Sequence, residues 1–581
     1  MRKILFFITI IFLAVGCQTA QNEKILAYIA SDRNSIATYQ IEDEKLLPAD
    51  SVQRGLQVVA FPDQKKKIDK QWYVPIRIKR IDYYVLQSNL TTDPRLAVQE
   101  KSMWVRTAAS IIADRSTSDI AGLADKGQQL EVLDYDTLLH NGRVNRYMIT
   151  FSGDTGWVYG KYLVHDSLQA AERYRATFYD SVQAKVRDTW GGGAPQGCDM
   201  YPTEKPIFKN NRMPSPVYAL YLSISPAAIR NIDKYIELAK TTKINAFVLD
   251  MKDNECPAFK AETFEQLSPT NYKWGGKEKE QMYHYAIGRL HEEGFYVIGR
   301  ITCFKDSYFV KDHPECAITD ITTGEPFFHN KAYWPSAYDR RVWEFNVKLA
   351  KECVKKFSIN EINFDYVRFP DRMQSVADQI NYHNIYDESK VQAIQRFVQY
   401  ATDELHELGV YVSIDVFGES ANRGYTTPYG QYWPAISNAA DVICGMPYPD
   451  HFAKGYAGLK EPWNQPYKTL YHWGQTVQGR QAETASPAKV RTWIQVYHVM
   501  QHVDPNGIDY NARNITEEIR GLYDAGCQDG YATWLSNSSL NSYTEKADAF
   551  RIDYIDDYQQ RLSEKQETEN TTEQDSINLA K

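Results

Sequence analysis

The sequence predicts an α/β chain with a TIM (β/α)8 barrel over residues 214–555 and small all-β domains in front of it. From Val217 onward, short apolar stretches that fit buried parallel strands alternate with stretches of helical periodicity. Eight strands, each followed by a crossover, over roughly 330 residues match the size of such a barrel. The preceding residues show short alternating strands at close spacing with Gly and Asp at the turns, which is typical of small β domains.

The predicted barrel strands are short, mostly apolar stretches. They are Val217–Leu222, Ala246–Met251, Tyr296–Thr302, Glu361–Asp365, Tyr411–Val416, Val442–Met446, Val490–Tyr497 and Gly530–Trp534. Helices are predicted between most of them, with the clearest at Pro226–Thr241, Arg340–Lys356, Val391–Glu407 and Ile515–Ala525. A doubly wound open sheet is the alternative. Against it, no Gly-x-Gly-x-x-Gly motif follows the first strand.

Residues 1–17 are predicted to be a targeting segment. Arg2 and Lys3 precede an apolar stretch, 4–15, that is too short to span a bilayer as a stable helix. Small residues then precede Cys17, and this arrangement resembles a lipobox, in which the cysteine is acylated. The resemblance implies a lipid-anchored protein of the bacterial cell envelope. Gln18 at the next position favours the outer membrane if the host is Gram-negative.

Two all-β domains are predicted, at residues 25–95 and 100–166. The second resembles a bacterial SH3 domain and ends in the characteristic stretch Thr155–Leu163. The first resembles a degenerate copy, because only Tyr84–Leu90 matches. The resemblance implies binding to peptidoglycan, and a structural spacer is the alternative.

The segments on either side of the barrel are predicted to be less ordered. Residues 167–213 read as a helical connector with a Gly-rich break at 191–193. Residues 556–581 are rich in Glu, Gln, Thr and Asn, and their composition predicts a disordered tail.

Composition excludes some classes of function. The net charge of −8 argues against a nucleic-acid partner, which would require a basic face. The seven cysteines after Cys17 show no Cys-x-x-Cys, and the histidines are isolated, so no metal site and no cofactor are expected. Aromatic residues make up 13% of the chain, with 41 Tyr and 12 Trp. Such a surplus suits either large cores or surfaces that stack on flat ligands such as sugar rings.

The candidate site lies where the predicted strands end, because barrel enzymes carry their active sites at the carboxyl ends of the strands. The polar and aromatic residues at these ends are Asp250, Lys252, Asp253, Asp365, Tyr366, Arg368, Asp415, Glu419, Tyr448, His451, Trp493 and Trp534. Glycosidic hydrolysis needs two carboxyl groups, one to protonate the leaving oxygen and one to attack the sugar or to activate water. Alternatively, some of these carboxylates only cap helix N-termini and hold loops.

Four motifs at these ends resemble one family. They are Val248–Asp253, Phe364–Pro370, Asp415–Gly418 and Met446–His451. Together they resemble a family of barrel domains assigned as glycoside hydrolases of uncharacterised activity, distantly similar to the α-amylase clan. The resemblance covers Val217 to Tyr543. That clan places its nucleophile after strand four and its general acid/base after strand five.

The resemblance implies roles for individual residues. Asp365 is the expected nucleophile, and Asp415 the expected acid/base, with Glu419 in reserve. Arg368 either lowers the pKa of Asp365 or forms a surface salt bridge. The strand-two residues Asp250, Lys252 and Asp253 are expected to bind sugar hydroxyls or to brace the site. The remaining side chains, namely Tyr366, Tyr448, His451, Trp493 and Trp534, are expected as sugar-binding walls or as ordinary barrel packing.

The expected function is therefore hydrolysis or transfer at a glycosidic bond of a polysaccharide, by a retaining two-carboxylate mechanism. A non-catalytic glycan- or wall-binding scaffold is the alternative, and a structural component of an envelope complex is a third. Two exposed carboxyls within roughly 5–10 Å would favour the enzyme. A buried, salt-bridged Asp365 with Asp415 turned away would favour the scaffold.

Overall fold

The computed structural model describes residues 24–31, 35–43, 45–97, 102–137, 139, 143–172, 197–422 and 426–579. It forms two compact units, one of Met1–Arg106 and Asp125–Ala171, the other of Thr107–Ala124 and Glu172–Lys581. Cys17 and most of the predicted connector, 173–196, lie outside the described residues.

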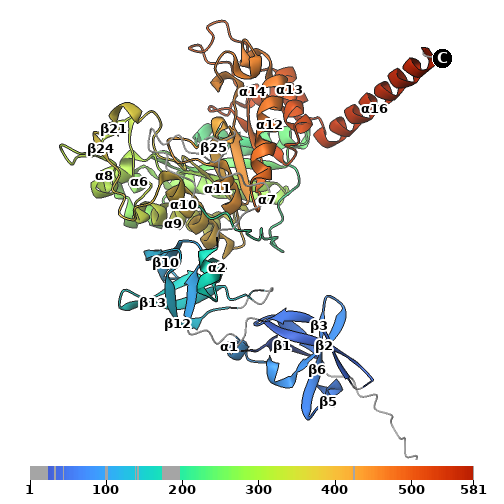
Figure 1. The fold of residues 1–581 in the computed structure, drawn as a ribbon. Coiled ribbons are helices and arrows are strands. Elements are labelled where there is room, and N and C mark those ends of the chain that lie inside the picture. Colours follow the sequence, from blue (N-terminus) through green and yellow to red (C-terminus); the bar gives the residue numbers. More distant parts are fainter. Residues whose placement is uncertain are drawn as a thin grey trace, which may run out of the picture. The chain divides into compact units, whose positions relative to one another are not determined.

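The larger unit contains a nearly closed sheet of parallel strands with helices around it (Figure 1). In chain order its strands are β16 (Val217–Leu222), β17 (Ala246–Asp253), β19 (Tyr296–Thr302), β23 (Glu361–Asp365), β25 (Tyr411–Phe417), β26 (Val442–Met446), β27 (Lys489–Val490), β28 (Thr492–Gln495) and β29 (Gly530–Trp534). Neighbours in the sheet follow this order, and β29 pairs back onto β16. Every predicted strand is present, so the mixed α/β prediction is confirmed.

The seventh strand is split at Arg491, and this is where the sheet is not fully closed. β27 pairs with β26, whereas β28 pairs with β29. The Arg491 N–H still donates to the Ile443 carbonyl at 3.1 Å, so the two halves stay on the same path. The sheet therefore encloses one interior, filled from β16, β17, β19 and β26 by residues such as Tyr221, Val248, Ile298 and Cys444.

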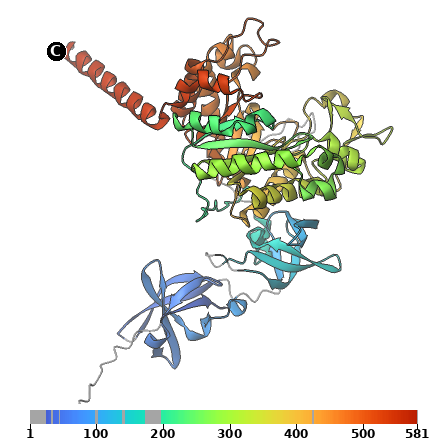
Figure 2. The ribbon, with the colours of Figure 1, turned by 180° about the vertical axis from the view of Figure 1, so that it is seen from behind.

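Amphipathic helices cover the outside of this sheet (Figure 2). They include α3 (Pro226–Arg230), α4 (Ile232–Lys240), α7 (Lys277–Glu292), α9 (Arg340–Phe357), α10 (Lys390–His406), α12 (Pro466–Ala482) and α13 (Ala512–Asp524). The predicted helix at Pro226–Thr241 breaks at Asn231, whose backbone leaves the helical region. α10 begins where predicted because Ser389 and Gln392 form a capping box.

The smaller unit is built from antiparallel strands, which confirms the all-β prediction at the coarse level. Its first sheet contains β1 (Ile25–Ile29), β2 (Ser35–Glu42), β3 (Lys45–Gln53), β4 (Gln57–Ala60), β5 (Lys66–Ile68), β6 (Gln71–Ile78), β7 (Ile81–Leu86) and β8 (Leu90–Thr91). Further along the chain lie β9 (Ser102–Val105), β12 (Gln129–Tyr135), β13 (Arg146–Phe151), β14 (Asp154–Tyr159) and β15 (Leu163–Val164). The first sheet closes over Ala27, Ile29, Ile76 and Val85, which are almost fully buried.

One hairpin from the N-terminal part of the chain belongs to the larger unit. β10 (Ala109–Asp114) and β11 (Asp119–Ala124) pair with each other, and Ser118 at the turn is fully buried. The Tyr400 hydroxyl donates to the Ser118 carbonyl at 2.7 Å, and Glu404 accepts from both the Ser118 hydroxyl and Lys351. The hairpin is thus anchored to α9 and α10 by a buried polar network.

The C-terminal segment differs from its prediction. Helix α16 spans Tyr554–Leu579, where the composition predicted a disordered tail from residue 556. Its first turns are fixed by ion pairs: Asp557 contacts Arg520 at 2.5 Å, and Arg561 contacts Asp524 at 2.6 Å. A polar composition does not exclude a helix, because Glu, Gln and Lys have high helix propensity even where the helix buries little surface. Among the described residues, none of the helices has the length and apolar character needed to cross a bilayer.

A buried ion pair fills the end of the barrel at which the strands begin. Glu361, the first residue of β23, contacts Arg491 at 2.6 and 3.2 Å, and the Tyr296 hydroxyl donates to the same carboxylate at 3.1 Å. Glu361 is fully buried and Arg491 nearly so. Removing one partner of such a pair leaves the other charge unpaired in the protein interior.

We therefore predict that Glu361→Ala destabilises the barrel by about 3–5 kcal/mol, because Arg491 loses the carboxylate with which it pairs inside the sheet. Calorimetry should show the barrel transition at a clearly lower temperature. Lys243→Ala serves as the control, because its pair with Asp553 is solvent-exposed and should contribute less than about 1 kcal/mol. Equal effects of the two changes would contradict this interpretation.

Candidate active site

A cavity of about 520 Å³ opens at the carboxyl ends of the strands. The predicted site residues that line it are Asp253, Asp365, Tyr366, Arg368, Asp415, Tyr448, His451, Trp493 and Trp534. They come from the ends of six different strands or from the loops that follow them. The topology therefore brings together residues that lie far apart in the sequence.

Arg300 on β19 holds the acidic side of the cavity together. Its Nη1 contacts Asp250 at 2.6 Å and Asp253 at 3.4 Å, and its Nη2 contacts Asp365 at 2.5 Å. Its Nε lies 3.9 Å from Asp415 Oδ2. Because Arg300 is only 2% exposed, these charge interactions are weakly screened by water. One guanidinium thus positions the carboxylates of three strands.

Asp365 ends β23 and reaches into the cavity. Its Oδ2 pairs with Arg300, and its Oδ1 accepts the N–H of Tyr366 at 2.6 Å. Tyr366 has a left-handed backbone, with φ of 53°, which turns the chain sharply after the strand. Of the two roles expected for Arg368, the structure matches the salt bridge: its Nη1 donates to the Phe369 carbonyl and to Asp371, and it is Arg300 that contacts Asp365.

Asp415 lies on the neighbouring strand and is buried. The register of β23 and β25 pairs Phe364 with Ile414, so Asp365 and Asp415 occupy adjacent inward positions. Asp415 Oδ1 accepts hydrogen bonds at 2.8 Å from both Asn363 and the Trp493 indole. Its Oδ2 has no hydrogen-bond partner among the described residues. Burial, reinforced by the negative charge of Asp365, raises the pKa of Asp415 well above its ordinary value.

Asp250 lies behind Arg300 and does not line the cavity. The Tyr221 hydroxyl donates to its Oδ2 at 2.5 Å, and Arg300 holds its Oδ1. Burial raises the pKa of Asp250 to about 6, although the positive charge of Arg300 opposes that rise. Of its two expected roles, the geometry matches bracing of the site and not contact with a sugar.

Two further expected site residues lie away from the cavity. Lys252 is fully buried, donates to the Thr302 carbonyl at 2.8 Å and pairs with Asp306 at 3.0 Å, so it cannot reach a sugar. Lys252 and Asp250 are separated by one residue, but β17 is irregular between them, which alters the strict alternation of side chains. Glu419 is exposed and accepts from the Tyr429 hydroxyl, outside the cavity lining.

Sequence reasoning missed Arg300, Tyr221 and Asn363. Arg300 was visible as a charged residue near a strand end. Its position was the signal, because Tyr296, Ile298 and Arg300 alternate along β19, and the first two face the barrel interior. A charge at the next inward position must lie among the strand-end carboxylates.

Aromatic rings line the cavity beside Arg300, whose guanidinium carbon lies 5.9 Å from the Tyr221 ring centre and 5.5 Å from that of Trp534. The Trp534 ring lies 4.8 Å from that of Tyr221 and 5.7 Å from that of Trp493, at right angles to the latter. Tyr448 is stacked on Trp534 at 6.4 Å. Trp493 is 2% exposed and Tyr448 5%, so they serve mainly as packing, whereas Trp534 is partly exposed toward the cavity. Burying such rings against a sugar face is favourable.

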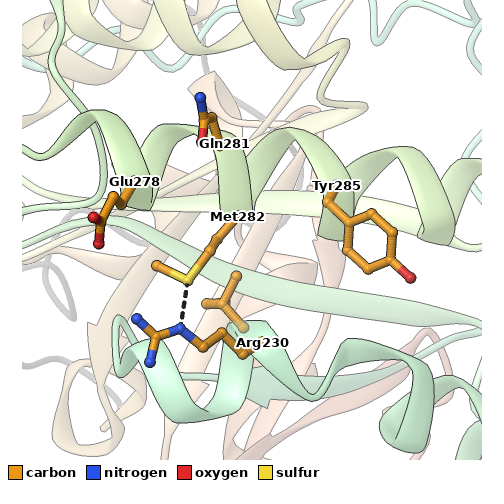
Figure 3. A pocket seen from close by; sticks show the side chains of 6 residues that line it. Arg230, Glu278, Gln281, Met282 and Tyr285 are labelled. Carbon is orange, nitrogen blue, oxygen red and sulfur yellow. Dashed lines mark hydrogen bonds between the residues drawn. The ribbon is translucent and has the colours of Figure 1, made fainter.

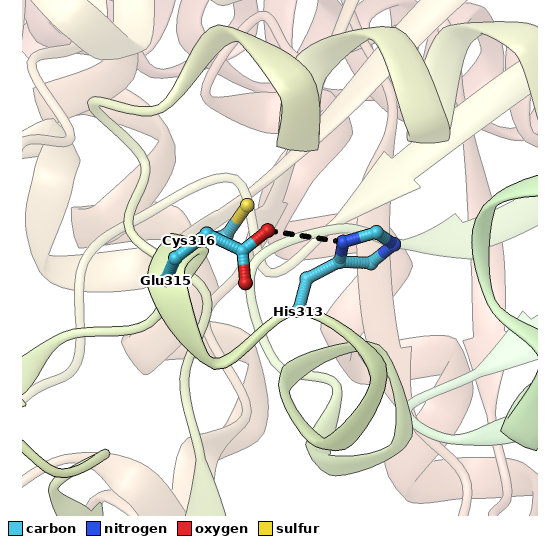
Figure 4. A group of neighbouring side chains, drawn as sticks. All are labelled: His313, Glu315 and Cys316. Carbon is cyan, nitrogen blue, oxygen red and sulfur yellow. Dashed lines mark hydrogen bonds and ion pairs between the residues drawn. The ribbon is translucent and has the colours of Figure 1, made fainter.

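Two other groups of side chains lie outside this cavity. A shallow hollow lies between α3 and α7, where Arg230 contacts the Met282 sulfur at 3.1 Å beside the exposed Tyr285 (Figure 3). His313, Glu315 and Cys316 form a second group (Figure 4). His313 contacts Glu315 at 3.2 Å and the Leu267 carbonyl at 2.7 Å. Arg341 lies 3.4 Å from Glu315 and would repel a cation, so this donor set fits a metal poorly.

Comparison with protein families gives one match. The family described as "Putative glycosyl hydrolase domain" matches residues 219–543, which is more than half of the chain and includes every predicted site residue. No curated protein matches the chain.

Several solved structures resemble parts of the chain. A hypothetical protein from Ruminiclostridium thermocellum is 27% identical over 34% of this chain and 97% of its own, with a TM-score of 0.29. The chitobiase of Flavobacterium johnsoniae is 10% identical over 58% of this chain and 48% of its own, with a TM-score of 0.38. The β-N-acetylhexosaminidase of Bacteroides fragilis is 12% identical over 61% and 71%, with a TM-score of 0.35.

The raised pKa of Asp250 predicts a pH-dependent stability. The folded protein binds this proton more tightly than the unfolded chain, so stability from Asp250 is present below pH 4 and is lost as the pH rises to about 6. Asp250→Asn should remove this dependence. As the pH rises from about 4 to about 6, the parent should lose up to about 3 kcal/mol of stability relative to the variant. The check is thermal unfolding at several pH values, and parallel curves for the two proteins would contradict the prediction.

Proposed function

The chain belongs to the glycosyl hydrolase domain family that matches its barrel, and on this premise we propose that it is a glycoside hydrolase acting on a polysaccharide. The observation that carries the proposal is the pair of carboxyls at the ends of adjacent strands. Asp365 is held by Arg300, whereas Asp415 has a raised pKa, and both line one cavity with aromatic walls. Two carboxyls in different protonation states are what glycosidic hydrolysis requires.

Asp365 is the proposed nucleophile. The Arg300 guanidinium at 2.5 Å and the Tyr366 N–H at 2.6 Å hydrogen-bond to its two carboxyl oxygens and fix its orientation. Neighbouring strands lie about 4.8 Å apart, a spacing that suits the short separation of carboxyls in retaining enzymes. Attack by Asp365 on the anomeric carbon would form a glycosyl-enzyme ester as the bond to the leaving oxygen breaks.

Asp415 is the proposed general acid and base. Its raised pKa keeps it protonated, and we assign delivery of the proton to Oδ2, which is buried and has no hydrogen-bond partner among the described residues, so that a substrate must reach it for this step. In the second step the same carboxylate takes a proton from water, which attacks the anomeric carbon and releases Asp365. Asn363 and Trp493 hold Oδ1 throughout, so that Oδ2 is the oxygen left to transfer the proton.

A non-catalytic glycan-binding scaffold is the second candidate. Two observations favour it: Asp365 is only 8% exposed and is salt-bridged, and Asp415 is only 1% exposed. Against it, Asp415 is not turned away but lines the same cavity. The two candidates differ in whether a bond is broken, and an activity assay decides between them.

The fold class, the role of the N-terminal domains and the cellular location are also proposals. We infer that the parallel sheet is a TIM (β/α)8 barrel, and that the antiparallel N-terminal part contains SH3-like domains that hold the chain on peptidoglycan. The lipobox-like residues before Cys17 support acylation, and with it attachment to the outer membrane of a Gram-negative cell envelope.

The first test is release of reducing ends from envelope, capsular and plant polysaccharides. We expect release by the parent and a loss of roughly 10³-fold or more in Asp365→Asn, because the variant lacks the nucleophile. Asp378→Asn is the matched control, since Asp378 is exposed on the loop after the same strand. Activity that survives in Asp365→Asn would remove that residue from the mechanism, and inactivity of all three proteins would favour the scaffold.

The second test is the pH dependence of kcat/KM. Because Asp415 acts in its protonated form, the rate should fall as the pH rises through its raised pKa. Asp415→Asn keeps the hydrogen-bonding shape but carries no exchangeable acidic proton. The variant should therefore lose most of its activity and the alkaline fall with it. An unchanged alkaline limb in Asp415→Asn would assign that limb to another group.

A further inference from the structure

Arg368 presents an unused hydrogen-bonding edge to the cavity. Its Nη1 donates to the Phe369 carbonyl and to Asp371, each at 3.1 Å. Its Nε and Nη2 make no hydrogen bond to any residue that the structure describes, yet neither atom is sealed from solvent. The side chain as a whole is only 5% exposed and lines the cavity. Nε and Nη2 form the side of a guanidinium that binds two oxygens at once.

Aromatic rings hold this guanidinium in place. Its central carbon lies 4.6 Å from the Phe417 ring centre, 5.0 Å from that of Tyr366 and 5.2 Å from that of Trp334. Such contacts favour the charged group and limit its motion. The free edge is therefore preorganised, and a ligand that uses it pays little to order it.

Lys305 adds a second positive charge beside the same rings. Its Nζ lies 5.1 Å from the Tyr366 ring centre and 5.9 Å from that of Trp334. No carboxylate lies within ion-pair distance of Lys305 in the described part of the chain. By contrast, the carboxylates of Asp250 and Asp365 are already paired with Arg300, and Asp371 is the one carboxylate that pairs with Arg368.

We propose that the sugar bound in this cavity carries a carboxylate, as a uronic acid does, and that Arg368 binds it through Nε and Nη2. This inference rests on the proposed function in so far as the cavity must bind a sugar. Two coplanar oxygens match the flat edge of a guanidinium, and Lys305 supplies further positive potential. A neutral sugar offers this edge only hydroxyl and ring oxygens, which bind a guanidinium more weakly than the charged pair of carboxylate oxygens, and that difference provides the specificity.

The test is binding of sugar acids to the full chain carrying Asp365→Asn, which prevents turnover. Titration calorimetry would compare oligomers of D-glucuronate and D-galacturonate with the corresponding D-glucose and D-galactose oligomers. We expect at least one acidic oligomer to bind about tenfold or more tightly than its neutral counterpart. Sulfated neutral oligomers form a further arm, and equal or tighter binding of these would overturn the assignment of a carboxylate.

Three variants of the Asp365→Asn protein locate the effect. Arg368→Gln should abolish the preference for the acid. Arg368→Lys keeps the charge but not the flat edge, and should retain only part of the preference, which guards against a loss caused by misfolding. Arg372→Gln is the matched control, because Arg372 approaches the same Asp371 at 3.6 Å but is 88% exposed. It should bind like the parent.

The outcomes separate this inference from the proposed function. Absence of any preference for acidic oligomers, or a preference that survives in Arg368→Gln, would overturn the inference. If the parent hydrolysed only neutral glycans, the inference would be overturned, but the proposed glycosidase function would stand. Tight, Arg368-dependent binding of an acidic oligomer that the parent never cleaves would support the inference and contradict the hydrolase.

Discussion

The site depends on one buried cation. Arg300 contacts or approaches carboxylates from β17, β23 and β25, and without it several negative charges would face one another in a cavity with little water. Arg300 also lies at different distances from the carboxyls of Asp365 and Asp415. Asp365 contacts Arg300 directly, whereas Asp415 lies 3.9 Å from Nε, is enclosed by Asn363 and Trp493, and has a raised pKa that favours its neutral form. One residue on β19, the strand on the other side of β23, thus contributes to the asymmetry that two similar side chains need for different chemical roles.

The two ends of the barrel use buried charge for different purposes. At the end where the strands begin, Glu361 and Arg491 pair with each other and Glu361 also accepts a hydrogen bond from Tyr296, although the buried Arg491 Nε has no hydrogen-bond partner among the described residues. At the other end the groups are satisfied only in part, since Asp415 Oδ2 and the Nε of Arg300 lack hydrogen-bond partners in the described structure. Unsatisfied polar atoms are costly in a protein interior, and these two belong to residues that line the cavity.

Much of the fold was predictable, because buried parallel strands are recognisable from their continuous apolar composition. The strand ends also pointed to Asp365 and Asp415, since β/α topology gathers such ends at one face. The sequence could not predict which groups the charged side chains at the strand ends contact. Lys252 and Arg368 both looked like site cations, yet one points to Asp306 outside the cavity and the other contacts aromatic rings. Composition also failed for α16, where ion pairs to Arg520 and Asp524 order a polar segment.

The hairpin of β10 and β11 makes the larger unit discontinuous along the chain. Ser118 and Glu404 are both fully buried, although 286 positions separate them. Exchange of the N-terminal β domains between related genes, with a crossover after residue 124, would therefore remove a piece of the barrel's own surface and leave Glu404 and Lys351 without their Ser118 contacts. The hairpin and the helices α9 and α10 therefore form one structural unit, although they lie far apart in the sequence.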